Sequence, residues 1–334
     1  MVSEKVQYYT PNKVLTYGKV LNIVMGNRSS GKSFGWKNFL LNRFIKKGRQ
    51  FLYVRRYVNE IQGSRAEELF NDVADLKYPD HDIQIKKQTI LVDGEKAGWL
   101  IGLSATYKIK SSDFKDVDFI VLDEAFSEDG RYLKDEVNKI LNLYQTVARG
   151  GGKVIRNNVK IILISNAVSL INPYIRFLKA YNIKEGYNVG KGYVIECFKN
   201  ESVNREIRKS EFYQLIEGTD YANYAMENEF YLDNNCYIEK PKLDKASYYA
   251  TILFRDKKIA LYYTKEGYIY CCRNINNDCL YKFSVDCYNE NYFMLEKSHT
   301  FLKELRDAFN NNKVRFSNIE VKGDMLEILN ITSK

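Results

Sequence analysis

Short apolar runs alternate with longer amphipathic stretches along the first 200 residues of the chain. This alternation predicts an α/β domain with a mostly parallel sheet, and the near-continuous apolar character of the runs suits strands that are covered on both faces. The strands are expected at Val20–Met25, Gln50–Val54, Phe119–Leu122 and Val159–Ile164.

Two amphipathic stretches predict the helices that matter most for function. One begins directly after Gly31. The other runs from about Leu133 to Ala148, where apolar residues recur at spacings of three and four and therefore share one helix face. Three consecutive glycines at 150–152 are expected to end this second helix abruptly.

The pattern changes after residue 200. Residues 201–235 are polar with helical character, which predicts a linker or small helical subdomain. From about residue 236 the chain contains tyrosine-rich runs separated by charged breaks, which predict antiparallel hairpins, and a helix is expected at about 299–310. The predicted organisation is an N-terminal domain of residues 1–200, a helical linker of residues 201–235 and a C-terminal α+β domain of residues 236–334.

Composition narrows the possible classes of protein. The 334 residues are 45% hydrophobic and 28% charged, a globular balance, and no apolar run reaches the ~18 residues needed to span a bilayer. The N-terminal residues lack the apolar core of a signal peptide, so the chain is expected in the cytoplasm without a membrane partner. The net charge of +9 favours a polyanion such as nucleic acid, although a solvated basic surface or the codon bias of an AT-rich genome would give the same excess.

Metal–thiolate and histidine chemistry have little support in the sequence. None of the six cysteines forms a C-x-x-C pair, and the two histidines, His81 and His299, lie far apart. Reduced thiols without a bound metal are therefore expected.

The sharpest chemical signal is a complete G-x-x-x-x-G-K-S string that follows an apolar run and precedes an amphipathic stretch. In such a phosphate-binding loop (Walker A), backbone N–H groups surround the phosphates and the following helix adds positive partial charge. Lys32 is expected to reach the β- and γ-phosphates of ATP, and Ser33 is expected to bind Mg²⁺. The residues expected to bind nucleotide are Gly26, Asn27, Arg28, Ser29, Ser30, Gly31, Lys32 and Ser33.

A second signal, four apolar residues followed by Asp123 and Glu124, comes about 90 residues after this loop. A buried strand would deliver Asp123 to the metal at its C-terminal end, while Glu124 would orient and deprotonate the attacking water. Alone, this Walker B motif is weak evidence for a nucleotide site. It becomes strong evidence because it follows the phosphate-binding loop by about 90 residues.

Two further residues follow predicted elements. Asn166 ends an apolar strand and is expected to sense the γ-phosphate, unless it only opens the turn before Pro173. Arg149 ends the second helix, where it either complements the helix dipole or reaches the γ-phosphate of a neighbouring subunit as an arginine finger. Spacing alone leaves both alternatives open.

Four basic residues beside these motifs allow several roles. Arg55 and Arg56 end a predicted strand, where they would contact nucleotide or DNA, or form a solvated pair. Lys108 and Lys110 lie in a polar segment before the Walker B strand, where a lid or subunit interface competes with an ordinary exposed surface.

Together these motifs resemble the DNA packaging ATPases of phi29-like bacteriophages, which are terminase-like P-loop motors of the ASCE class. The resemblance rests on the blocks LTYGKVLNIVMGNRSSGKS, NRFIKKGRQFLYVRRY, FIVLDEAF, EVNKILNLYQTVAR and ISNAVSLINPY, on a short hairpin near DGEKAGWLI, and on a weaker similarity in LIEGTDYANYAMENEF. It covers about the first 235 residues well and the remainder in architecture only.

The resemblance implies a homopentameric ring on the portal vertex of a procapsid in the infected host, which hydrolyses ATP with Mg²⁺ to move double-stranded DNA. It assigns Ser33 and Asp123 to the metal, Glu124 to catalysis and Asn166 to the sensor. The interior of the phosphate-binding loop is expected to contribute only backbone amides. Arg149 and Lys110 match residues that act on the neighbouring subunit, and Arg56 is assigned to the nucleotide site.

The C-terminal part resembles the RNase H-like domain of large terminases. A two-metal nuclease needs an acid inside the first strand and partner carboxylates. The expected first strand, Tyr248–Phe254, has no acid, and Asp256 falls in the following turn. The domain is therefore expected to be vestigial, without nuclease activity, and the resemblance implies that it docks on a packaging RNA and on the portal (connector) protein.

Other classes of protein stay open as alternatives. A terminase large subunit with an active nuclease, a helicase, another DNA-stimulated P-loop ATPase or a small-molecule kinase would share the nucleotide motifs. A GTPase is disfavoured because no N-K-x-D motif occurs. A relict, non-catalytic loop is disfavoured because Lys32, Ser33, Asp123 and Glu124 are all intact.

Overall fold

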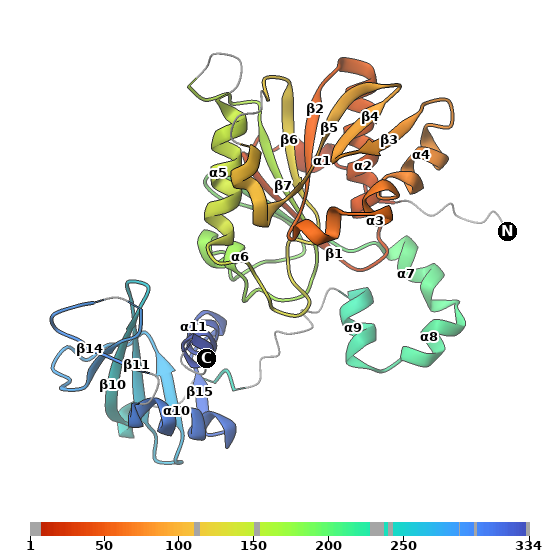
Figure 1. Ribbon diagram of the computed structural model, residues 1–334. Coiled ribbons are helices and arrows are strands. Elements are labelled where there is room, and N and C mark those ends of the chain that lie inside the picture. The colour runs from red at the N-terminus through yellow and green to blue at the C-terminus, as the bar shows by residue number, and fades with distance from the viewer. Residues whose placement is uncertain are drawn as a thin grey trace. The chain divides into compact units, whose positions relative to one another are not determined.

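The computed structural model describes residues 8–109, 114–149, 154–227, 237–239, 243–286, 288–296 and 299–331. The chain forms two compact units, Met1–Leu232 and Asp233–Lys334. Each unit has its own sheet (Figure 1). Each unit also has its own hydrophobic core. By its contacts, the helical segment after residue 200, which the sequence predicts as a linker or small helical subdomain, groups with the first unit.

A nine-stranded sheet forms the centre of the first unit, in the order β3-β4-β5-β2-β6-β7-β1-β9-β8. The six strands from β5 to β9 in this order run parallel, and antiparallel hairpins complete both edges. This confirms the predicted α/β class and its mostly parallel sheet. The strands are β1 (Leu21–Gly26), β2 (Gln50–Arg55), β3 (Ile83–Lys86), β4 (Thr89–Val92), β5 (Glu95–Gly102), β6 (Val117–Leu122), β7 (Lys160–Asn166), β8 (Gly186–Val189) and β9 (Tyr193–Phe198).

Helices cover both faces of this sheet, which is why its central strands are apolar on both sides (Figure 1). In β1, Ile23 and Met25 pack in the core cluster that includes α5 and α6, while Val24 packs in the cluster that includes α2, α3 and α4. The α-helices are α1 (Asn12–Leu15), α2 (Lys32–Lys47), α3 (Ser64–Glu67), α4 (Asn71–Lys77), α5 (Glu136–Ala148), α6 (Pro173–Leu178), α7 (Glu201–Arg208), α8 (Glu211–Ile216) and α9 (Asp220–Glu227), with short 3₁₀ helices at Val58–Ile61 and Leu103–Ile109.

Helix α5 begins at Glu136 rather than at the predicted Leu133. The Glu136 carboxylate accepts a hydrogen bond from the backbone N–H of Leu133, at 2.8 Å, so residues 133–135 form a turn around this side chain. Asp135 has a left-handed backbone, with φ of 56°, which interrupts the helical geometry just before α5. The predicted C-terminal end at Ala148 is confirmed, with Arg149 as the C-cap.

The parallel strands deliver their C-terminal ends to one edge of the sheet. The last residues of β1 and β7, Gly26 and Asn166, are direct partners in the register. Strand β6 lies beside β7 and ends at Leu122, immediately before Asp123. The loops that carry the predicted nucleotide motifs therefore meet at this edge, where ligands bind in open α/β sheets.

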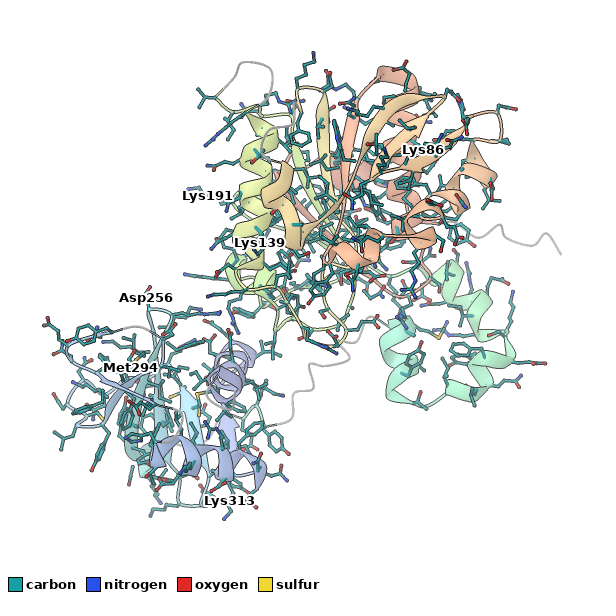
Figure 2. The ribbon with its side chains drawn as sticks, viewed as in Figure 1. Lys86, Lys139, Lys191, Asp256, Met294 and Lys313 are labelled. Atoms are coloured by element: carbon teal, nitrogen blue, oxygen red, sulfur yellow. The ribbon has the colours of Figure 1, made fainter. Side chains whose placement is uncertain are left out.

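The second unit contains a six-stranded mixed sheet in the order β14-β13-β10-β11-β12-β15. Strands β10, β11 and β12 form the predicted antiparallel hairpins, and β13 lies parallel to β10. Asp256 occupies the turn between β10 and β11, and Met294 lies in the edge strand β14 (Figure 2). The strands are β10 (Ser247–Phe254), β11 (Lys257–Tyr263), β12 (Ile269–Cys272), β13 (Lys282–Ser284), β14 (Phe293–Met294) and β15 (Val314–Phe316); the helices are α10 (Thr300–Asn310) and α11 (Ile319–Ile331), with a 3₁₀ turn at Leu243–Lys245.

Helices α10 and α11 pack against this second sheet through the buried residues Leu302, Leu305 and Met325. The predicted helix at about 299–310 is thereby confirmed. Within the described residues, no helix has both the length and the apolar character that crossing a bilayer requires.

Candidate nucleotide site

The loop between β1 and α2 has the geometry of a phosphate-binding loop. Both of its glycines are required by their surroundings. A Cβ on Gly26 would lie 2.1 Å from the carbonyl oxygen of Phe198, and Gly31 has a φ of 84° and packs against the ring of Tyr8. Because α2 begins at Lys32, its first backbone N–H groups face the loop.

Lys32 lies buried inside this loop. Its Nζ donates to the carbonyl oxygens of Gly26 and Asn27, at 3.0 and 2.7 Å, and to the hydroxyl of Ser30 at 3.1 Å. Burial lowers the pKa of Lys32 to about 7, an effect that Asp123 opposes and that the charge of Arg28 reinforces. An anion in the loop would supply the opposite charge that Lys32 lacks among these neutral partners.

Asp123 meets Ser33 at the C-terminal end of β6. The Ser33 hydroxyl donates to one carboxylate oxygen at 2.9 Å, and the hydroxyl of Tyr53 donates to the other at 2.5 Å. Only 6% of Asp123 is exposed. A carboxylate beside a serine hydroxyl, at the start of a phosphate-binding helix, is a donor set that suits Mg²⁺.

Glu124, the next residue in the chain, contacts Arg55. The guanidinium of Arg55 lies 2.7 Å from Glu124, 3.0 Å from Glu60 and 3.5 Å from Asp123. Glu124 itself is 69% exposed at its side chain and has a left-handed backbone with φ of 55°. The glutamate is therefore accessible to water but held by an ion pair that sequence reasoning did not anticipate.

Asn166 lies where the sequence suggested, at the end of β7 and beside Lys32. Its side-chain oxygen accepts a hydrogen bond from Lys32 Nζ at 3.3 Å, and its amide donates to Glu128 at 3.4 Å. Glu128 in turn accepts a hydrogen bond from Arg28 at 2.7 Å. These contacts connect the loop, strand β7 and the segment after β6 in one polar network.

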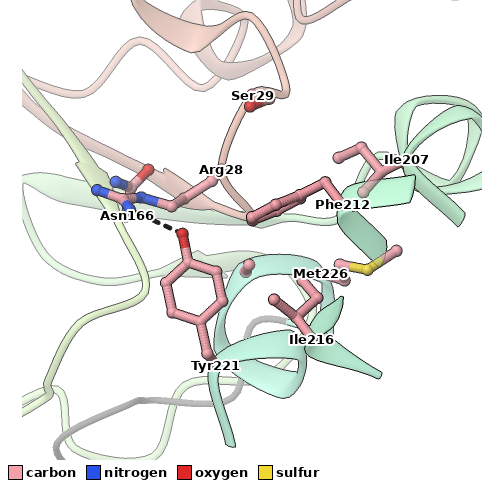
Figure 3. Close-up of a pocket in the computed structure, with 9 residues that line it drawn as sticks. Arg28, Ser29, Asn166, Ile207, Phe212, Ile216, Tyr221 and Met226 are labelled. Atoms are coloured by element: carbon pink, nitrogen blue, oxygen red, sulfur yellow. Dashed lines mark hydrogen bonds between the residues drawn. The ribbon is translucent and has the colours of Figure 1, made fainter. Parts of the chain in front are cut away.

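Helices α7–α9 contact the phosphate-binding loop. Beside this contact, the loop and the helices enclose a pocket of about 280 Å³, with Arg28 and Asn166 on its polar side. Figure 3 shows the hydroxyl of Tyr221 at the end of the Arg28 side chain, a contact of 3.3 Å. The remaining lining is mainly apolar and comes from Ile207, Phe212, Ile216, Ala225 and Met226.

Asn27 anchors the loop to the same helices. Its amide donates to the side chain of Asn204 at 2.8 Å, and its oxygen accepts from the backbone N–H of Asn200 at 3.0 Å. The backbone N–H of Arg28 donates to the carbonyl of Ala225. Asn27 thus contributes its side chain as well as its backbone, contrary to the expectation for the loop interior. No sequence signal marked this contact, because Asn200 and Asn204 lie before the weakly similar block that begins at Leu215.

Two predicted site residues lie away from this centre. Arg56 is only 7% exposed and pairs with Glu136 at 3.0 Å, with a further hydrogen bond to the carbonyl of Ala125. The assignment of Arg56 to the nucleotide is therefore corrected to a buried structural ion pair. Successive residues of an extended chain point to opposite faces of the sheet. Arg55 therefore meets Glu60, Asp123 and Glu124, whereas Arg56 points into the protein, where it meets Glu136.

Arg149 is exposed at the C-terminal end of α5, and among the described residues no hydrogen bond or ion pair joins it to the loop. This position leaves it available to a second molecule. Lys110 lies outside the residues that the structure describes, and so does the side chain of Lys108.

Comparisons with known proteins agree with this geometry. Residues 3–331 match the family model of the podovirus DNA encapsidation protein (Gp16). The DNA packaging proteins of Bacillus phages phi29 and PZA are each 34% identical over 333 residues, covering 97% of this chain and 98% of theirs.

Solved structures extend the likeness to the fold. A chain of the phi29 viral genome packaging motor assembly is 32% identical with a TM-score of 0.76, covering 97% of this chain and 99% of that one. The crystal structure of the N-terminal domain of the phi29 DNA packaging ATPase is 39% identical with a TM-score of 0.53, and the match covers 58% of this chain and 97% of that domain.

Proposed function

Because the chain belongs to the podovirus DNA encapsidation protein family, we propose that it packages phage DNA by hydrolysing ATP at the site described above. The packaging role follows from the family and from the similarity to a packaging motor chain over nearly the whole length. One observation supports the ATPase mechanism above all others. Asp123 contacts Ser33 of the phosphate-binding loop, and Glu124 follows it in the chain.

In the proposed mechanism, backbone N–H groups of residues 29–33 and the ammonium of Lys32 bind the β- and γ-phosphates. Ser33 and Asp123 would hold Mg²⁺, which neutralises charge on the phosphates. Glu124 leaves Arg55, accepts a proton from water, and the water oxygen forms a bond to the γ-phosphorus as the bond to ADP breaks. The amide of Asn166 orients the γ-phosphate beside Lys32.

Hydrolysis needs a second subunit in this proposal. Arg149 is exposed on a rigid helix end and would stabilise charge on the γ-phosphate of a neighbouring subunit, a contribution of about 10³–10⁵ in rate for known fingers. A homopentameric ring on the portal of the procapsid would satisfy this geometry. Hydrolysis would then depend on contact between neighbours, which couples it to the movement of double-stranded DNA.

The second unit is proposed to dock on the portal and on a packaging RNA. Most of its exposed large apolar side chains lie on or beside β13 and β14, where they are available to a partner. They are Leu280, Tyr281, Tyr288, Phe293 and Met294. An active nuclease has less support from the sequence of this unit, since β10 carries no acid and Asp256 lies in the turn after it.

Substitution of the proposed base tests the ATPase mechanism. The Glu124→Gln variant is expected to bind ATP as tightly as the unmodified protein, and to lose at least about 10²-fold in DNA-stimulated turnover because the amide cannot accept the proton. Nucleotide binding is measured by fluorescence titration, and hydrolysis by phosphate release. Glu68→Gln, at an exposed acid of the same unit, serves as the matched control. Normal turnover by Glu124→Gln would disprove the assignment.

A further inference from the structure

The side chain of Arg156 contacts several backbone carbonyl groups near the C-terminal end of α5. It is only 7% exposed, yet its guanidinium reaches four backbone carbonyl groups. Nη1 donates to Lys115 at 2.7 Å, and Nη2 lies 2.8, 3.0 and 2.9 Å from the carbonyl oxygens of Phe114, Val117 and Val147. The backbone N–H of Arg156 donates to the carbonyl of Ala148 at 2.8 Å.

Two of these contacts fall on the last residues of α5. The final carbonyl groups of a helix have no partner within the helix, and a cation nearby also complements the helix dipole. Arg156 satisfies the carbonyls of Val147 and Ala148, which are both buried. The remaining contacts fix the same point to the segment that enters β6. The end of α5 is thus clamped to the central sheet from a position beyond it in the chain.

Arg149 is the next residue after the clamped turn. It is the C-cap of α5, and its backbone N–H still donates to Gln145 at 3.3 Å. Its side chain is exposed, in contrast to its buried neighbours Val147 and Ala148. The direction in which Arg149 leaves the protein is therefore set by the backbone that Arg156 holds.

We propose that Arg156 is a positioning residue for Arg149, and that it acts through the helix end on hydrolysis in the neighbouring subunit. This inference rests on the proposed function, in which Arg149 reaches the neighbour's γ-phosphate. A displacement of about 1 Å at a reacting group can cost about 10²-fold in rate, so a finger on an unclamped helix end would lose most of its effect. Lysine cannot replace the clamp, since a single ammonium does not span carbonyls that the planar guanidinium reaches from two nitrogens.

The test uses rings of the full-length protein assembled with DNA. Arg156→Lys alone is expected to lower kcat for ATP about 10²-fold with KM within about two-fold, because Lys32, Ser33 and Asp123 are untouched. Gln145→Ala, an exposed residue one turn before Arg149, should leave both constants unchanged. A thermal melt and a nucleotide titration establish that Arg156→Lys is folded and binds ATP; failure of either would show a general structural role and overturn the proposal.

Mixed rings separate a positioning role from damage to the subunit's own site. Subunits with Arg156→Lys retain Glu124, and subunits with Glu124→Gln retain a clamped Arg149. Where the second kind lies beside the first, a complete site forms, so mixing is expected to recover activity that neither variant has alone. Absence of recovery, under conditions where the pair below recovers, would overturn the role of Arg156.

A second pair tests the underlying function independently. Arg149→Ala mixed with Glu124→Gln must also recover activity if Arg149 acts on the neighbour. If this pair fails, the finger itself is wrong and the positioning role falls with it. If this pair recovers and the Arg156→Lys pair does not, only the further inference fails.

Discussion

Acids in the two units of this protein have different nearest neighbours. At the nucleotide edge of the first unit, Asp123 meets the hydroxyls of Ser33 and Tyr53, while the guanidinium of Arg55 lies farther away, at 3.5 Å. Among the described residues of the second unit, Glu320 and Asp324 instead meet basic side chains. Glu320 lies 2.6 Å from Lys257, and Arg273 contacts both acids.

This difference teaches that the identity of the neighbours decides what an acid can do. The shortest contacts of Asp123 are with neutral hydroxyls, so its charge is balanced only by the more distant Arg55 and remains able to attract a cation. Asp324 instead has its shortest contact with Arg273, which already neutralises it. The neighbours of Asp123 suit metal-assisted chemistry, whereas the ion pairs of Glu320 and Asp324 suit stability.

The strongest way to break this comparison is to neutralise one acid in each unit. Asp123→Asn keeps the shape of the side chain but removes the charge that would hold Mg²⁺, and it is expected to reduce ATP turnover by about 10³-fold. Asp286→Asn should leave turnover unchanged. Phosphate release at saturating Mg²⁺ measures both. Equal losses in the two variants would mean that the second unit also takes part in hydrolysis.

A smaller effect is expected from pH, through Lys32. Its pKa of about 7 means that the ammonium loses its proton as pH rises above 7, while bound phosphates favour the charged form. ATP affinity should therefore fall by up to about tenfold per pH unit above 7, with uptake of nearly one proton on binding at pH 8. Calorimetry in buffers of different ionisation enthalpy measures the uptake. Lys32→Arg, which stays protonated, should show none.

The smallest expected effect concerns the ion pair between Arg55 and Glu124. Since the glutamate is largely exposed, the pair contributes at most about 1 kcal/mol, which corresponds to about a five-fold change in rate. Arg55→Met is expected to raise DNA-independent hydrolysis by up to this factor, because Glu124 no longer has to leave a partner. The ratio of DNA-stimulated to basal hydrolysis should fall accordingly. An unchanged ratio would mean that the pair does not restrain Glu124.

Residues within motifs could be predicted because their local geometry follows from the motif itself. A buried strand ending in Asp123 and a glycine loop leading to Lys32 leave little freedom in where those side chains lie. The parallel register then brings Asn166 beside Gly26. The mostly parallel sheet follows from the same apolar runs.

Partners far apart in sequence could not be predicted. Arg55 pairs with Glu124 across 69 positions, and Asn27 pairs with Asn204 across 177. No periodicity marks such pairs, since each depends on which strands and helices pack together. Arg56 was misassigned for the same reason. Its partner Glu136 lies in helix α5, which the sequence predicts, but the sequence does not show against which part of the sheet this helix packs.

The side chain of Asn27 has a consequence for how the loop can vary among relatives. Positions inside a phosphate-binding loop are often regarded as interchangeable, since the ligand meets only the peptide groups. Here Asn27 is only 1% exposed, and its side-chain amide donates a hydrogen bond to the side-chain oxygen of Asn204. A change at either position leaves a polar group stranded in the interior unless the other changes too. Positions 27 and 204 are therefore expected to change together among relatives. The choice of residue inside the loop is restricted by a partner in helix α7.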